Sequence, residues 1–183
     1  MNEDTSLHNY LKHQRDMYRN QKMWGDLPKE SPIRVADIYD WFLENAVNLE
    51  GMDLELADKA IQNHFYEPEI KQCYYNSMMM MKPTHEAPEL EYWEGWATAV
   101  IPLNHAWNVQ DGKVVDTTWS LLEHQREGAE DLQYLGVKIP SSFIMELMSI
   151  DTKFKPANTA GPFIWDYAIK CIQEKNGGLT NGQ

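Results

Sequence analysis

The segment that decides the fold runs from His105 to Trp119 and reads HAWNVQDGKVVDTTW. Its central pair, Asp111-Gly112, is typical of a two-residue type I′ turn, in which both turn residues take a positive φ angle. Aromatic and β-branched residues are frequent on both sides of this pair, as expected of β-strands. The segment is therefore predicted to form a β-hairpin whose strands pair outward from the turn.

The register of this hairpin brings a histidine and a carboxylate together. Counting outward from the turn places Trp107 opposite Asp116, and the next pair on the same face is His105 with Thr118. His105 and Asp116 are then diagonal neighbours, roughly 7–8 Å apart at the backbone, which a hydrogen bond between the side chains can span. Such a pair is typical of the base and orienting carboxylate of a catalytic triad. A purely structural surface pair is the alternative.

The rest of the chain predicts an α+β fold with a helical N-terminal half, in which an antiparallel sheet of about four strands packs against helices. Segments rich in aromatic and β-branched residues predict strands at 90–101, 105–110, 113–119 and 133–139. Apolar residues at spacings of three and four predict helices at about 5–24, 34–47, 54–65, 73–81, 142–148 and 163–174.

These elements are expected to form one domain over residues 1–176, because 183 residues fit the usual size of a single domain. The domain divides into a helical part at 5–81, a sheet part at 89–139 and C-terminal helices at 142–176. A tail rich in glycine and asparagine at 177–183 is expected to be disordered.

Composition narrows the classes of partner and location. The chain has 16 basic and 28 acidic residues, a net charge of −12, which would repel a phosphate backbone and disfavours nucleic-acid binding. No apolar run approaches the ~20 residues that span a bilayer, and the N-terminus lacks the pattern of a signal peptide. Only two cysteines are present, which fits a reducing compartment. A cytoplasmic protein with neither membrane association nor a cofactor is expected.

Cys73 is the candidate nucleophile. It lies in a predicted helical segment upstream of the hairpin, and a cysteine near a helix N-terminus and beside a histidine has a lowered pKa. If Pro68 occupied the first turn of that helix, Cys73 would instead lie in mid-helix with little help from the dipole. A buried structural cysteine is the alternative. This structural role is expected for Cys171, which lies in an apolar helical pattern.

The chain resembles the core of the transglutaminase-like superfamily, within the papain-like thiol enzymes, over about residues 72–137. The resemblance rests on the order Cys73, His105, Asp116 and on the strings HAWN and VVDTTW. It implies a nucleophile helix packed on an antiparallel sheet that bears the His and Asp. It also implies Cys73 as nucleophile, His105 as general base and acid, and Asp116 as orienter.

By the same resemblance, backbone amides near Cys73 would form the oxyanion hole, while Trp107 and Trp119 would wall the site. The family commonly has Gly-Val or Gly-Tyr before its cysteine, and this chain has Lys71-Gln72 there.

Several further residues are candidates for contact with substrate. Tyr92, Glu94 and Gly95 precede the histidine strand, and a glycine there lets a substrate or a neighbouring strand approach closely, or marks a bulge. Gln72 and Asn76 flank the cysteine and could donate hydrogen bonds to an oxyanion, although solvent-facing helix positions are an equal reading.

The function expected from these residues is a thiol-dependent hydrolase or acyltransferase that acts on an amide or isopeptide bond of an amide- or peptide-containing substrate, with a protein among the candidates. Metal-dependent hydrolysis through Cys73, His85 and His105, with Glu86 nearby, is a weaker alternative, because these ligands lack the close spacing of zinc sites. The other alternative is an acidic binding or inhibitory protein that uses the same fold as a scaffold for a basic partner.

Overall fold

Within residues 6–20, 33–81, 90–98, 100–150 and 162–177, which the computed structural model of the chain describes, five antiparallel strands form one sheet. They follow the spatial order β1-β5-β2-β3-β4. Their bounds are Val47–Glu50 for β1, Glu91–Thr98 for β2, Pro102–Gln110 for β3, Lys113–Val115 for β4 and Gln133–Lys138 for β5.

Seven α-helices surround the sheet in the described part of the chain, which confirms the α+β class. They are α1 (Ser6–Asn20), α2 (Val35–Asn45), α3 (Leu54–Asn63), α4 (Cys73–Met80), α5 (Glu123–Glu127), α6 (Ser141–Ile150) and α7 (Ile164–Gly177). Two short 3₁₀ turns, η1 (Trp119–Leu121) and η2 (Ala129–Asp131), flank α5. None of the helices described is both long and apolar enough to cross a membrane.

The sheet has one strand more than predicted. The missed strand, β1, lies in the half of the chain that was expected to be helical, and its residues are all at least partly exposed. It therefore lacks the alternation of buried and exposed side chains by which strands are recognised. At the other end, α7 extends to Gly177, and residues 178–183 of the predicted tail lie outside the described residues.

The hairpin turn forms as predicted. Asp111 and Gly112 have φ angles of 51° and 79°, and the predicted register holds for the three pairs nearest the turn, the last being Asn108 with Val115. An aspartate and a glycine both tolerate these angles, so the turn places the two strands in one fixed register.

The predicted hairpin pairing does not continue beyond Val115, so the predicted pairs of Trp107 with Asp116 and His105 with Thr118 are wrong. The reason is local. The carboxylate of Asp116 accepts hydrogen bonds from the N–H groups of the second and third residues after it, which bends the chain out of the strand and into η1. The side chain of Asp116 nevertheless stays buried beside β3.

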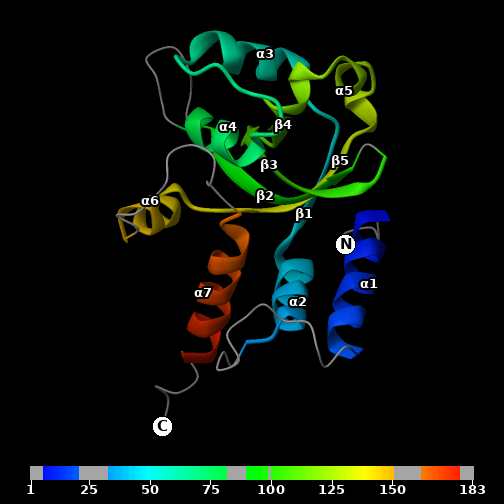
Figure 1. The fold of residues 1–183 in the computed structure, drawn as a ribbon, viewed down its shortest axis with the longest axis vertical. Helices are drawn as coiled ribbons and strands as arrows, with labels where there is room; N and C mark the ends of the chain where they lie inside the picture. Colours follow the sequence, from blue (N-terminus) through cyan, green and yellow to red (C-terminus); the bar gives the residue numbers. More distant parts are fainter. Residues whose placement is uncertain (1–5, 21–32, 82–89, 99, 151–161, 178–183) are drawn as a thin grey trace.

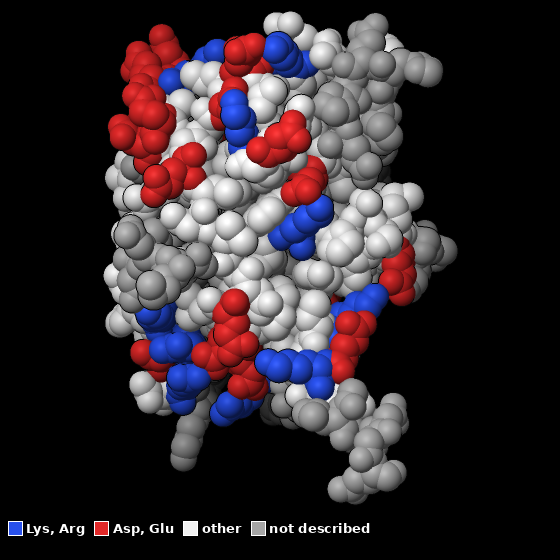
Figure 2. All heavy atoms as spheres, turned by 180° about the vertical axis from the view of Figure 1, so that it is seen from behind, with Lys and Arg blue, Asp and Glu red and all other residues white. Residues whose placement is uncertain are grey.

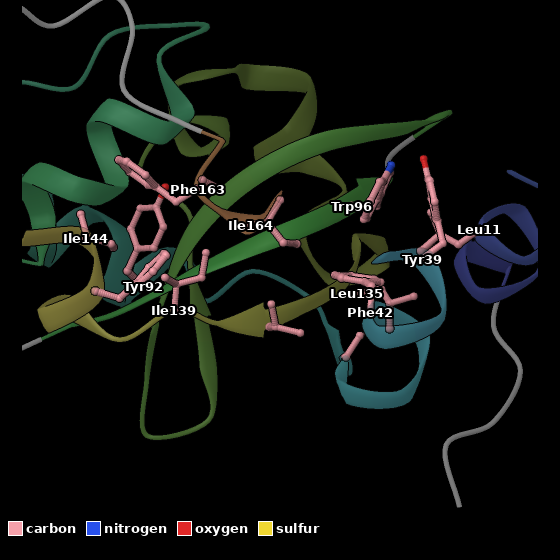
Figure 3. Packing of buried hydrophobic residues seen from close by; sticks show 14 of the residues in the cluster. Leu11, Tyr39, Phe42, Tyr92, Trp96, Leu135, Ile139, Ile144, Phe163 and Ile164 are labelled. Atoms are coloured by element: carbon pink, nitrogen blue, oxygen red, sulfur yellow. The ribbon is translucent and has the colours of Figure 1, made fainter. Parts of the chain in front are cut away.

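The two faces of the sheet bury separate cores. Helices α1, α2 and α7 lie on one side of the sheet, and α3 and α5 lie on the other (Figure 1). The first core, against α1, α2 and α7, includes Leu11, Tyr39, Phe42, Tyr92, Trp96, Leu135, Phe163 and Ile164 (Figure 3). The second includes Trp93, Ala97, Trp107, Val109, Val114, Trp119, Leu132 and Tyr134. Alternate residues of β2 enter opposite cores, as the pleat requires.

Gly95 allows β2 and β5 to approach closely beside the histidine strand. It pairs with His105 on one side and with Gly136 on the other. A Cβ atom at Gly95 would lie 2.1 Å from the carbonyl oxygen of Leu135 and 2.6 Å from the Cα of Gly136. Both are backbone atoms, which cannot move aside as a flexible side chain can.

We expect Gly95→Ala to lower the free energy of unfolding by at least about 3 kcal/mol, because the methyl group would push two paired strands apart. Gly177→Ala is the control, since a Cβ there meets nothing within 4 Å, and it should change stability by less than about 1 kcal/mol. Urea unfolding of both variants measures the difference. Equal stabilities would show that the close approach does not constrain the sheet.

Candidate active site

His105 and Asp116 form a buried hydrogen-bonded pair. The Nε2 atom of His105, on β3, lies 2.6 Å from Oδ2 of Asp116, which follows β4. The residues are 4% and 0% exposed. The predicted pairing of these two side chains is therefore confirmed, although the backbone reaches it through a turn rather than through a longer strand.

Each oxygen of the Asp116 carboxylate has two hydrogen-bond partners. Its Oδ1 accepts from the N–H groups of Thr118 at 3.0 Å and Trp119 at 2.9 Å. Its Oδ2 accepts from the hydroxyl of Tyr134, on β5, at 3.1 Å, in addition to His105. A carboxylate held on both oxygens has a fixed orientation, and so does the imidazole bound to it.

Aromatic rings enclose the imidazole. The ring of Trp119 stacks on that of His105 with centroids 4.3 Å apart, and the rings of Trp107 and Tyr134 lie at 6.3 and 6.5 Å. The two tryptophan rings thus flank that of the histidine, and Trp107 is fully buried. Such walls keep water from competing for the hydrogen bond to the carboxylate.

Cys73 begins helix α4. The helix has Gln72 as its N-cap, so the alternative in which Pro68 starts the helix is wrong, and Cys73 lies in the first turn. The thiol is half-buried, and its interaction with the ring of His105 contributes to raising the pKa of that ring. Because Nε2 faces Asp116, Nδ1 is the ring nitrogen left for sulfur.

The surroundings of His105 favour its charged form. Burial acts to lower the pKa of the ring, but the charge and hydrogen bond of Asp116 outweigh it, and Cys73 adds to their effect, so that the pKa rises to about 10. The ring is therefore an imidazolium at neutral pH. A cation beside the sulfur stabilises the thiolate form of a cysteine.

We expect the His105 ring of the wild-type protein to titrate above pH 8 in an NMR titration, and that of Asp116→Asn to titrate at a clearly lower pH, because the carboxylate that outweighs the effect of burial is then removed. The raised pKa of His105 also makes the stability of the fold depend on pH. The pair stabilises the fold fully below about pH 6.5, and this contribution is lost as the pH rises through about 10. A wild-type ring that titrates near 6.5 would contradict the assigned ion pair.

The other sequence-predicted residues are mostly internal. Tyr92 is buried and donates its hydroxyl to Glu94 at 2.6 Å, and Gly95 faces the backbone of β5. Both N–H groups of the Asn76 side chain are bound to protein oxygens, so neither is left for an oxyanion. Gln72 differs, because it is half-buried at the helix start and its side chain makes no cap hydrogen bond.

Glu94 joins the sheet to α7. Its carboxylate is buried and accepts the N–H groups of Phe163 and Ile164, each at 2.9 Å, at the start of that helix. Burial raises the pKa of this carboxyl to about 7. The sequence places Glu94 near the site. It indicates neither the hydrogen bonds of Glu94 to the start of α7 nor the bond from Tyr134 to Asp116. Glu94 and Phe163 are far apart in the chain, and an aromatic residue in a strand normally indicates only core packing.

Because the folded pKa of Glu94 lies above that of an exposed glutamate, stability should fall as the pH rises from about 4.5 through about 7. The change attributable to this group is about 3 kcal/mol at most. Glu94→Gln cannot ionise, so urea unfolding between pH 4.5 and 8 should show a flatter dependence for the variant. Parallel curves for the two proteins would rule out this titration.

Among the described residues, no group of three or more His, Cys, Asp or Glu side chains is arranged to hold a metal ion. His85 and Glu86, which the metal alternative invokes, lie outside the described residues. Comparison of the chain with protein-family models, with curated proteins and with solved structures gives no match. The arrangement of side chains is thus the basis for assigning a function.

Proposed function

We propose that the chain is a thiol-dependent hydrolase or acyltransferase that cleaves an amide or isopeptide bond of a peptide-containing substrate. The observation that supports this most is the arrangement in which Cys73 interacts with the ring of His105 and that ring in turn binds Asp116. It joins the first turn of a helix, a strand and a turn, which are distant in sequence. The nucleophile, the base and the orienting carboxylate of a triad need this connectivity.

The chemistry proceeds through a thioester. The sulfur of Cys73 attacks the carbonyl carbon and a C–S bond forms. The imidazolium of His105 then gives a proton to the leaving nitrogen as the C–N bond breaks. In the second half, His105 takes a proton from water or from an acceptor amine, which attacks the thioester, and the C–S bond breaks. Water gives hydrolysis and an amine gives transfer.

The oxyanion of each tetrahedral intermediate would form near the start of α4. The N–H groups in the first turn of a helix have no intrahelical acceptor, and they point along the axis toward this end. The amide of the half-buried Gln72 side chain is the other donor that we assign to this role.

The backbone before the nucleophile supports the resemblance to the transglutaminase-like superfamily. Lys71 takes a φ angle of 69°, in the left-handed region that glycine adopts readily. This is the position at which that family commonly has glycine. The resemblance and the geometry therefore lead to the same assignment for Cys73.

A catalytic thiol also bears on where the protein works. Cys73 and Cys171 are both free. A nucleophile of this kind must stay reduced, and we therefore propose a cytoplasmic location.

An acidic binding surface is the alternative function. The chain carries a net charge of −12. Acidic side chains gather at the end of the molecule where α5 lies (Figure 2). The exposed carboxylates of α5 and η2 are Glu123, Glu127, Glu130 and Asp131. They would attract a basic partner whether or not the thiol reacts.

Alkylation by iodoacetamide tests the thiol. We expect Cys73 to react at least about tenfold faster than Cys171 at pH 7, because the imidazolium favours its thiolate. Burial raises the pKa of the Cys171 thiol. Labelling is followed by mass spectrometry of the peptides. His105→Ala should bring the rate of Cys73 down to that of an ordinary thiol.

Cys73→Ser is the matched control and should keep the fold while abolishing the fast phase. Equal and slow labelling of both cysteines in the wild-type protein would contradict catalysis and favour the binding alternative.

A further inference from the structure

Asn76 lies on α4, three residues after Cys73, and its side chain is completely buried. Residues at this spacing share one side of a helix. A carboxamide has two N–H donors and two acceptor lone pairs. All four are used by protein groups within hydrogen-bond distance, which is the full capacity of the side chain.

Three of these bonds hold the segment that leads into the nucleophile. Oδ1 of Asn76 accepts from the hydroxyl of Tyr66 at 2.8 Å and from the N–H of Glu69 at 3.1 Å. Nδ2 donates to the carbonyl oxygen of Glu69 at 2.7 Å. The chain between Glu69 and Cys73 contains Lys71, whose φ of 69° is unusual for a lysine. A bound segment on its N-terminal side stabilises this conformation.

The fourth bond reaches the other half of the site. The second N–H of Nδ2 donates to Oγ1 of Thr118 at 2.8 Å. The backbone N–H of the same Thr118 donates to Oδ1 of Asp116 at 3.0 Å. One amide therefore connects the helix that carries the thiol to the turn that carries the orienting carboxylate, across 42 residues of sequence.

We propose that Asn76 is a positioning residue that holds the thiol of Cys73 against the His105–Asp116 pair. The proposal rests on the proposed function above, because it concerns the same site. The bond from Asn108 to the carbonyl oxygen of Ser77 joins the same helix to β3. Without the bond to Thr118, α4 would keep that attachment and lose its link to the turn. A small displacement of the thiol from the imidazolium weakens the stabilisation of the thiolate, which depends on distance.

The test measures the pH dependence of Cys73 alkylation in the full chain, with Cys171→Ala as the background so that one thiol reports. Thr118→Val removes the acceptor oxygen and keeps the shape and the backbone N–H. Thr118→Ser keeps the oxygen and is the conservative variant. Asn76→Asp removes both donors and is the stronger change. Circular dichroism and urea unfolding establish that each variant is folded under the assay conditions.

We expect Thr118→Val to move the midpoint of the alkylation profile up by about one pH unit and to slow alkylation at pH 7 by about tenfold. Thr118→Ser should restore the wild-type profile. A residue with a merely structural role would lower the urea midpoint and leave the profile of the folded fraction unchanged. Thr118→Val is the milder of the two changes that break the bond, so it remains informative if Asn76→Asp does not fold.

The outcomes separate the two proposals. If wild-type Cys73 reacts with the rate and midpoint of an ordinary thiol, both proposals are overturned. If wild-type Cys73 is fast and folded Thr118→Val has the same profile, the positioning role of Asn76 alone is overturned and the proposed function stands.

Discussion

The carboxylate of Asp116 is the group on which the arrangement of this structure most depends. A buried charge is unfavourable unless it is paired and hydrogen-bonded, and this one is held by backbone N–H groups, a tyrosine hydroxyl and an imidazole. The same bonds end β4, begin η1 and join β3 to β5. Loss of the carboxylate would therefore affect the path of the chain as well as the charge of His105.

The two faces of the sheet have different roles because neighbouring residues of β2 face opposite sides of it. Glu94 points toward α7 and binds the N-terminus of that helix, while Gly95 lies next to His105 and leaves room for β5. The strand that backs the candidate site thus also attaches the last helix. A substitution of either residue would therefore alter the packing on both sides of the sheet.

The parts of the structure that are predictable from the sequence are those set by near neighbours. Asp111-Gly112 determines the turn and the three strand pairs next to it, which bring Asp116 back alongside the strand of His105, although the pairing predicted beyond Val115 does not form. The bonds that complete the site are of another kind. Asn76 reaches Thr118 only once the chain has folded, and the same holds for the bond from Tyr134 to the carboxylate of Asp116. No local periodicity encodes such contacts, since they depend on how distant elements pack.

Because these contacts differ in sequence separation, the parts of the site come together one after another during folding. His105 and Asp116 are only 11 residues apart and are joined by a tight turn, so closing the loop between them costs little entropy. The thiol comes from a helix that reaches them only after the sheet and its partners have come together, and long-range contacts of this kind form slowly. A partly folded chain would therefore hold the pair of His105 and Asp116 before Cys73 reaches it. The thiol would stay apart from the imidazole until the last contacts form.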